Sequence, residues 1–210
     1  MQQFDVFIVG ASFAGLTLAH HLSKTLRILI VDGKSAAGSS VESTGLITEK
    51  TKSQFQTFID INRYITNPIR SICVIAPDFD DYFISRTQEP WIYQTDTKAL
   101  VKAMAQTLPE NVTFMPSTIF TGVETGNTFK ILKNGKPEMI EAKFLVGADG
   151  AQSKVANSFP QLDKNRKFLF GYEQVFFGDV HLGPDPAETI YHFWFGEFSL
   201  GYGGWLSPTI

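Results

Sequence analysis

The stretch Asp5-Val-Phe-Ile-Val-Gly-Ala-Ser-Phe-Ala-Gly15 decides the fold of this 210-residue chain. The apolar run at residues 4–9 is typical of a parallel strand that is buried on both faces. The run breaks at Gly10 into a turn of small residues, and a helical pattern follows from about Phe13. A strand, a glycine turn and a helix in this order predict a dinucleotide-binding unit, because backbone N–H groups at the helix start can hold a pyrophosphate.

The turn has the spacing G-x-S-x-x-G, with Gly10, Ser12 and Gly15 in its fixed positions. Gly10 would allow the tight turn, and Gly15 would let the helix pack closely on the strand. Ser12 stands where the full fingerprint has a second glycine, and a serine is small enough for the backbone to approach the phosphates. The residues expected to bind the phosphates are Gly10, Ala11, Ser12, Phe13, Ala14 and Gly15.

A second strand is expected at residues 27–31, and it ends at Asp32. An acid at the end of the second strand is part of the same fingerprint, because its carboxylate can accept hydrogen bonds from the hydroxyls of a ribose. Asp32, with Gly33 directly behind it, is therefore a candidate for holding the ribose of a nucleotide.

A second glycine turn follows much later, in the stretch Phe144-Leu-Val-Gly-Ala-Asp-Gly-Ala-Gln-Ser153. The apolar strand before it would place Asp149 and Gly150 at the carboxyl edge of the parallel sheet, where ligands of such folds bind. The alternative is an ordinary strand-to-helix turn, since glycine and aspartate are common in turns. After a nucleotide fingerprint, we expect the second turn to belong to the same site.

The two segments together resemble the flavoprotein superfamily that includes para-hydroxybenzoate hydroxylase and the geranylgeranyl reductases. Members have an N-terminal G-x-G-x-x-G, an acid that ends the second strand, and a G-A-D-G-x-x-S segment after a β meander; the similarity covers residues 4 to about 155. It implies that the cofactor is FAD, with its ADP half on the first glycine turn and Asp32. It also implies that Asp149 and Gly150 border the pyrophosphate and the riboflavin.

The chain departs from the family pattern at two positions where members usually have an arginine, occupied here by Thr97 and Ala156. Lys98 and Lys154 would compensate in part, because an ammonium is a flexible point charge where a guanidinium is a rigid fork. The resemblance therefore adds Lys98 to the expected cofactor-binding residues.

The tail segment Gly201-Tyr-Gly-Gly-Trp-Leu-Ser-Pro208 is similar to the Tyr-x-Trp-x-Phe-Pro segment that lines the prenyl pocket of geranylgeranyl reductases. An extra glycine separates Tyr202 from Trp205, and Ser207 takes the phenylalanine position. The resemblance implies that Tyr202 and Trp205 line a substrate pocket, and a glycine-rich bend in a sheet is the alternative. The many aromatic residues between positions 168 and 205 could wall a pocket for an isoprenoid or an aromatic ring, or fill an ordinary core.

We predict an α/β fold with a Rossmann-like FAD-binding domain, made of a parallel sheet and a β meander, and an interleaved antiparallel substrate domain. The FAD-binding domain is assigned residues 1–66 and 95–160, and the partial substrate domain residues 67–94 and 161–210. Relatives continue into a third FAD segment, which Gly178-Asp179 imitates only superficially because it lies in a strand pattern. The sequence is therefore interpreted as the N-terminal portion of a longer enzyme.

Composition restricts the classes of function. With 18 basic and 21 acidic residues and a net charge of −3, a nucleic-acid surface is not expected. No apolar run approaches the ~20 residues that span a bilayer, so we expect a cytoplasmic protein that meets a membrane only through a lipid substrate. The single cysteine, Cys73, is expected to be a small buried hydrophobe, and the histidines lack the spacing of metal ligands.

The resemblance implies an FAD-dependent oxidoreductase, and the tail favours a geranylgeranyl reductase-like enzyme that reduces prenyl carbon–carbon double bonds by hydride transfer from reduced flavin. An FAD-dependent aromatic monooxygenase and a truncated, non-catalytic nucleotide-binding domain stay open as alternatives. The sequence shows no dedicated NAD(P)H motif, so NAD(P)H and ferredoxin both stay open as electron donor. No catalytic residue and no oligomeric state are assigned.

Overall fold

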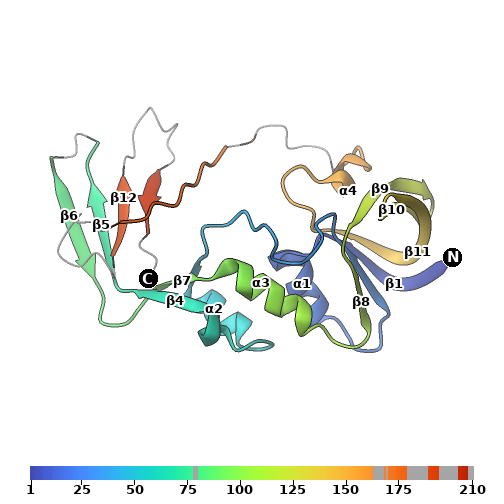
Figure 1. The fold of residues 1–210 in the computed structure, drawn as a ribbon, viewed down its shortest axis with the longest axis horizontal. Coiled ribbons are helices and arrows are strands. Elements are labelled where there is room, and N and C mark those ends of the chain that lie inside the picture. The colour runs from blue at the N-terminus through green and yellow to red at the C-terminus, as the bar shows by residue number, and fades with distance from the viewer. Residues whose placement is uncertain (78–79, 163–167, 169, 179–188, 194–202, 208–210) are drawn as a thin grey trace. The chain divides into compact units, whose positions relative to one another are not determined.

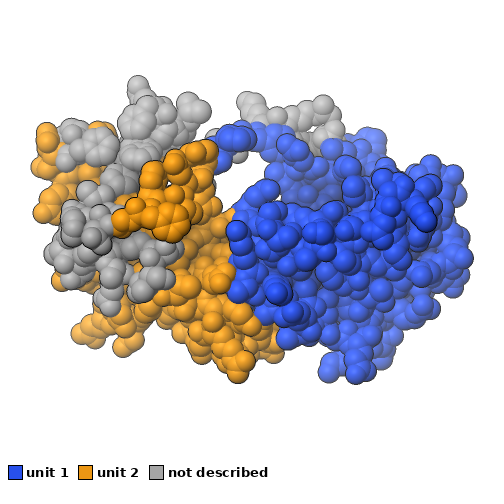
Figure 2. All heavy atoms as spheres, in the orientation of Figure 1, with its two compact units in different colours: residues 1–42, 98–171 blue, residues 43–97, 172–210 orange. Residues whose placement is uncertain are grey.

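A computed structural model of the chain describes residues 1–77, 80–162, 168, 170–178, 189–193 and 203–207 (Figure 1). The chain forms two compact units (Figure 2): unit 1 is Met1–Glu42 with Lys98–Gly171, and unit 2 is Ser43–Thr97 with Tyr172–Ile210. Residues 43–66, which the sequence analysis places in the FAD-binding domain, cluster with unit 2. They do so because strand β3 (Leu46–Thr48) pairs with strand β7 (Ile92–Thr95) of that unit. The assignment of each unit to a ligand stays a prediction.

A six-stranded sheet forms the centre of unit 1, in the order β8-β2-β1-β11-β10-β9. Strands β8, β2, β1 and β11 run parallel to one another, and β10 and β9 complete an antiparallel meander. The strands are β1 (Gln2–Val9), β2 (Ile28–Val31), β8 (Val112–Met115), β9 (Thr118–Thr125), β10 (Thr128–Lys133) and β11 (Lys136–Gly147). The predicted parallel sheet with a β meander is confirmed.

The sheet of unit 1 is covered on both faces, which explains why β1 is apolar without alternation. Helix α1 (Phe13–His21) packs on the face of Ile8, since a Cβ built at Gly15 would stand 3.2 Å from the Ile8 Cγ2 atom. The opposite face carries Phe7 and Val9, which form a core with Val155 of the short helix α4 (Lys154–Asn157) and with the meander. Residues 6–9 are all buried as a result.

Helix α3 (Thr97–Gln106) has Leu100, Val101, Ala103 and Met104 buried. It is tied to α1 by a hydrogen bond of 2.9 Å between His20 Nε2 and the Met104 carbonyl oxygen, in which the ring nitrogen donates. Burial lowers the pKa of His20, which favours the neutral imidazole, and the bond to Met104 then requires the tautomer that carries its hydrogen on Nε2.

Unit 2 contains two smaller sheets. Its three-stranded sheet has the order β3-β7-β4, with the helix α2 (Glu49–Phe55) and the 3₁₀ helix η1 (Ile61–Tyr64) between its first strand and β4 (Ile65–Ile69). The four-stranded sheet has the order β13-β12-β5-β6. Its strands are β5 (Ser71–Ile75), β6 (Tyr82–Arg86), β12 (Thr189–Phe193) and β13 (Gly204–Leu206).

The predicted antiparallel pairing of the substrate domain is found in the described strands of unit 2, apart from β12, which pairs with β5 in parallel. Antiparallel neighbours can be joined by a two-residue turn, whereas parallel neighbours need a long connection. The long stretch of chain between β5 and β12 satisfies that requirement, and periodicity alone does not reveal the direction of pairing.

Within the residues that the structure describes, no helix has both the length and the apolar character needed to cross a membrane.

Candidate cofactor-binding site

The two glycine turns lie at the same edge of the sheet in unit 1. In the register of the parallel strands, Val9 is paired with Val31 on one side and with Gly147 on the other. The Gly10 N–H donates to the Val31 carbonyl at 2.8 Å, and the Ala148 N–H donates to the Val9 carbonyl at 2.8 Å. Strands β1, β2 and β11 therefore end side by side, and the segments that follow them begin at the same edge of the sheet.

The glycines of the first turn are required by contacts within the chain. Gly10 has φ +109°, and a Cβ there would stand 2.2 Å from the Ala148 carbonyl oxygen. A Cβ at Gly15 would stand 2.0 Å from the Gly10 carbonyl oxygen. The contact at Gly10 is made by Ala148 of the second glycine turn, and the sequence could not reveal it. The contact at Gly15 keeps the start of α1 close to the strand.

Asp32 is fixed against the first turn by both of its carboxylate oxygens. Oδ2 accepts a hydrogen bond of 2.8 Å from the Ala11 N–H, and Oδ1 accepts one of 2.8 Å from the Lys34 N–H. Each oxygen has a second lone pair for a further donor. The half-buried carboxylate is thus oriented in advance, and it can accept hydrogen bonds from two neighbouring hydroxyls.

The start of α1 supplies donors beside this carboxylate. Ser12 is the N-cap in an extended conformation, and its carbonyl accepts from the Leu16 N–H at 3.0 Å. The N–H groups in the first turn of an α-helix have no carbonyl partner inside the helix, and they carry a partial positive charge. Phe13 and Ala14 belong to this turn, Ala14 is exposed, and the nine-residue helix suits an anion at its start.

Asp149 has a structural role that the sequence analysis missed. Its Oδ2 accepts from the N–H groups of Lys154 and Val155 at 2.7 and 3.2 Å, and the Ser153 hydroxyl donates to Oδ1 at 2.5 Å. The carboxylate therefore orders the second turn against the start of α4. Gly150 beside it is exposed with φ +80°, and no described atom lies within 4 Å of a Cβ built there, so its conformation rather than space favours glycine.

Gly33 and Lys98 are placed around the loop that follows Asp32. Gly33 is exposed at the beginning of this loop, and the loop crosses the first turn of α3 at Gly38. Gly38 has φ +77°, and a Cβ there would stand 2.4 Å from the carbonyl oxygen of Lys98. The structure thus brings the exposed Lys98 to the loop after Asp32. Sequence reasoning missed Gly38, because a glycine among small residues gives no signal of the helix that it touches.

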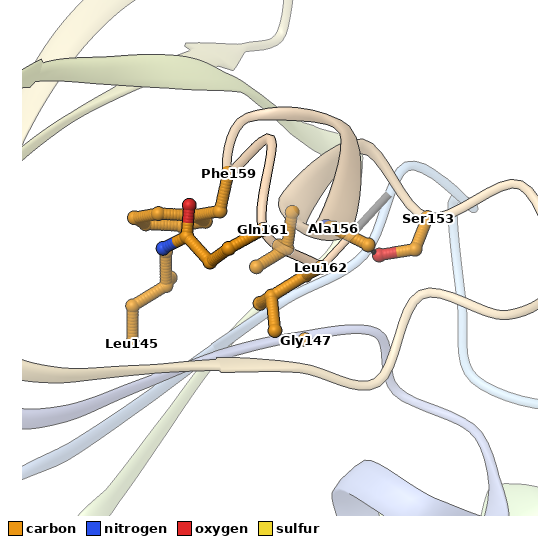
Figure 3. Close-up of a pocket in the computed structure, with 8 residues that line it drawn as sticks. Leu145, Gly147, Ser153, Ala156, Phe159, Gln161 and Leu162 are labelled. Atoms are coloured by element: carbon orange, nitrogen blue, oxygen red, sulfur yellow. Dashed lines mark hydrogen bonds between the residues drawn. The ribbon is translucent and has the colours of Figure 1, made fainter. Parts of the chain in front are cut away.

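A cavity of about 390 Å³ lies between β11 and α4 in unit 1 (Figure 3). Its lining includes Leu145, Val155 and Phe159, with the Ser153 hydroxyl and the Gln161 amide as polar groups. Because it is on the face of the sheet opposite to α1, it is separate from the start of that helix.

The predicted substrate residues lie in unit 2, and the structure describes one of them. Trp205 is on β13 with 40% of its surface exposed, and Tyr202 lies outside the described residues. Ser207 donates a hydrogen bond of 2.8 Å to the side-chain oxygen of the buried Gln94. The serine that departs from the family pattern is therefore anchored to strand β7.

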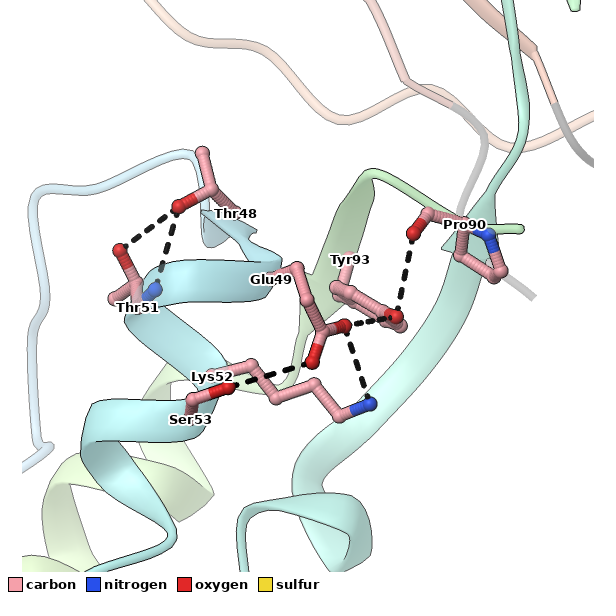
Figure 4. A network of polar contacts seen from close by, with 7 residues as sticks. All are labelled: Thr48, Glu49, Thr51, Lys52, Ser53, Pro90 and Tyr93. Atoms are coloured by element: carbon pink, nitrogen blue, oxygen red, sulfur yellow. Dashed lines mark hydrogen bonds and ion pairs between the residues drawn. The ribbon is translucent and has the colours of Figure 1, made fainter. Parts of the chain in front are cut away.

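Unit 2 also contains a polar network between α2 and β7 (Figure 4). The buried Tyr93 hydroxyl donates to Glu49, and the Lys52 ammonium lies 3.5 Å from Glu49 and 4.3 Å from the Tyr93 ring centre. The hydrogen bond from Tyr93 lowers the pKa of Glu49, with Lys52 adding to the shift, while burial raises the pKa of Tyr93. This network holds α2 on the sheet, and nothing in the sequence pattern predicted it.

A parallel sheet whose first turn is pressed against a second turn, with the Asp32 carboxylate held beside the first, defines the Rossmann-type fold of FAD-binding flavoproteins. The residues fit the ADP half of FAD on three counts: a tight glycine turn, backbone donors for phosphate, and an oriented carboxylate for the ribose.

Comparison with known proteins agrees with this class, although no protein-family model matches the chain. The chain is 25% identical over 163 residues to the FAD-dependent monooxygenase penM of Penicillium crustosum, covering 73% of this chain and 35% of that protein. The FAD-dependent monooxygenase janM of Penicillium janthinellum is 26% identical over the same length. The chain spans about a third of the length of these curated relatives.

Solved structures show the same fold. A geranylgeranyl bacteriochlorophyll reductase-like protein from Thermoplasma acidophilum has a TM-score of 0.78 at 18% identity, covering 100% of this chain and 54% of that chain. The p-nitrophenol 4-monooxygenase of Pseudomonas putida has a TM-score of 0.62 at 18% identity, covering 76% of this chain and 44% of that chain. The predicted resemblance in fold to FAD-dependent monooxygenases and geranylgeranyl reductases is thereby confirmed.

Proposed function

We propose that this chain forms the FAD-binding portion of an FAD-dependent oxidoreductase. The observation that carries the proposal is that the parallel strands β2, β1 and β11 end at one edge of the sheet, where they are followed by Asp32, the Gly10 turn and the turn at residues 147–150. The curated relatives, which are named FAD-dependent monooxygenases, support the choice of cofactor.

Each group has a proposed role toward the ADP half of FAD. Asp32 accepts hydrogen bonds from the ribose hydroxyls, and the backbone of Ala11–Gly15 receives the diphosphate. Asp149 and Gly150 shape the turn that borders the diphosphate and the riboflavin, and Lys98 adds a positive charge beside the loop after Asp32. The bound flavin would supply the redox chemistry, and the protein would orient it.

For the reaction, we propose first the reduction of carbon–carbon double bonds in a prenyl chain. The likeness to the geranylgeranyl reductase-like structure supports this choice, because it extends over all of unit 2, where Trp205 and Tyr202 would meet an apolar substrate. NAD(P)H or ferredoxin would reduce the flavin, in the cytoplasm, and a membrane would be involved only through a lipid substrate.

A second candidate is the hydroxylation of an aromatic substrate, favoured by the names of the curated relatives. Turnover without oxygen separates the two, since a hydroxylase needs dioxygen and a reductase does not. Product formation under anaerobic conditions would support the reductase, and a strict need for dioxygen would support the monooxygenase.

The proposal of a flavoprotein is tested by titrating the purified chain with FAD, followed by flavin absorbance and by isothermal titration calorimetry. We expect saturable binding with a perturbed flavin spectrum, and binding of ADP at the same site by competition. A folded chain that binds neither FAD nor ADP would contradict the proposal and leave the non-catalytic alternative.

A further inference from the structure

We propose that the open edge of strand β6 (Tyr82–Arg86) pairs with the same edge of a second copy of this chain, so that two four-stranded sheets join across a twofold axis. Strand β6 ends the order β13-β12-β5-β6, and among the described residues β5 is the one strand that pairs with it (Figure 1). The inference concerns unit 2 alone, and it does not depend on the proposed cofactor.

The backbone of β6 has one side that bonds to β5 and one side that faces the open edge. In an antiparallel pair, residues that exchange hydrogen bonds with the partner strand alternate with residues that exchange none. Directly before β6, the Ala76 N–H donates to the Asp81 carbonyl at 2.8 Å. Directly after it, the Thr87 N–H donates to the Arg70 carbonyl at 2.9 Å. Because the register between these two bonds is regular, the odd-numbered residues of β6 direct their N–H and C=O groups to β5, and the even-numbered residues direct theirs to the open edge.

The residues whose backbone faces the open edge are Tyr82, Ile84 and Arg86, and a twofold axis at Ile84 matches all three. In that register the Ile84 N–H of each copy donates to the Ile84 carbonyl of the other copy. Tyr82 then forms the next hydrogen-bonded pair with Arg86 of the second copy, because such pairs recur at every second residue. The edge is therefore complementary to itself along the whole length of the strand.

The side chains of β6 also suit this register. Tyr82 and Phe83 are 65% and 60% exposed, and they point to opposite faces of the sheet because they are neighbours in a strand. Each face of the edge thus presents one aromatic ring to a partner. On one face Tyr82 lies opposite Arg86 of the second copy, where a guanidinium can lie over the ring. On the other face Phe83 lies opposite Ser85 of the second copy.

The charges at the two ends of β6 favour an antiparallel arrangement of two copies. Asp80 and Asp81 precede the strand, and Arg86 ends it. Antiparallel pairing brings the acidic end of each copy beside the basic end of the other, and opposite charges across a strand pair stabilise it. Parallel pairing would bring like charges together. Lysine and proline, two residues with which natural proteins keep exposed edges apart, are absent from β6.

The test measures the mass of the chain by sedimentation equilibrium at concentrations up to about 1 mM, where we expect a reversible dimer. Ile84→Pro removes the N–H at the centre of the proposed pairing and spares the bonds to β5, because proline is tolerated where the N–H of an edge strand faces outward. Ile84→Ala is the matched control, since it removes the same side chain and keeps the N–H. With folding verified by circular dichroism, Ile84→Pro should raise the Kd of the dimer at least about tenfold, and Ile84→Ala should change it little.

An exchange of charges tests the register independently of the proline variant. Arg86→Glu, and the double variant Asp80→Lys with Asp81→Lys, should each dimerise more weakly than the original chain, because like charges then meet across the axis. An equimolar mixture of the two variants should form a mixed dimer, because every acidic end then meets a basic end. The mixed dimer should weaken as salt is added.

Three outcomes would overturn the proposal. A chain that remains monomeric over the whole range of concentrations would exclude a second copy as the partner of this edge. A dimer with the same Kd in Ile84→Pro and Ile84→Ala would place the interface on another surface. A mixture of the two charge variants that associates no better than either variant alone would exclude the antiparallel register, and this comparison decides the question if Ile84→Pro does not fold.

Discussion

Replacing Asp32 with alanine removes the carboxylate that is hydrogen-bonded to the first glycine turn at Ala11. In the structure each carboxylate oxygen accepts one backbone N–H at 2.8 Å, and each keeps a second lone pair that could accept a hydrogen bond from a ribose hydroxyl. The substitution should therefore act on binding through the ribose, and on the turn through the lost contacts with Ala11 and Lys34.

The expected magnitude follows from the strength of hydrogen bonds to charged groups. Losing the carboxylate should weaken ADP binding by about 1 to 3 kcal/mol, which is roughly a 5- to 150-fold increase in Kd. The effect of the ribose is isolated by comparing ADP with 2′-deoxy-ADP in calorimetry. The original chain should prefer ADP, and Asp32→Ala should bind the two ligands with nearly equal affinity.

A matched control is Asp5→Ala, because Asp5 is also a carboxylate of this sheet that accepts a backbone N–H, from Arg27 at 2.8 Å, and it contacts Lys143 at 2.7 Å. The control should lose some stability but retain the preference for ADP. The reasoning is refuted if the original chain binds ADP and 2′-deoxy-ADP equally, or if Asp32→Ala retains the full preference.

Two further predictions concern stability, measured by urea unfolding. Gly10→Ala should lower the free energy of unfolding by about 2 to 5 kcal/mol, because it combines a strained φ with a clash against Ala148. Gly150→Ala should lower it by only about 1 to 2 kcal/mol, because only the backbone conformation is strained there. Equal losses of stability in the two variants would contradict the close contact of the two turns. Because Tyr93 lowers the pKa of Glu49, their hydrogen bond stabilises the fold at neutral pH, and this contribution is lost as the pH falls through the lowered pKa of Glu49. The stability difference between the original chain and Tyr93→Phe should therefore shrink below about pH 4.3, and a difference independent of pH would argue against this bond.

The local elements near the first turn could be predicted from the sequence because local chemistry determines them. The apolar run before Gly10 and the acid after β2 predicted a strand, a turn, a helix and a second strand, and the structure has these elements in the same order. Their convergence with the turn at residues 147–150 was predicted from the general geometry of parallel sheets, and the register of Val9 with Gly147 confirms it.

Other features depend on contacts between distant segments, which periodicity does not encode. The engagement of Asp149 with α4, the crossing of α3 by the loop at Gly38, and the parallel pairing of β12 with β5 each need the tertiary structure. The position of residues 43–66 in unit 2 has the same cause, because β3 finds its partner in β7, far along the chain.

The most direct test of the shared site is hydrogen–deuterium exchange of the chain with and without saturating FAD, read by mass spectrometry. If the two glycine turns bind one cofactor, peptides covering residues 9–16 and residues 146–156 should both become protected when FAD is added. Protection of the first turn with no change at the second would contradict the common site at this edge of the sheet.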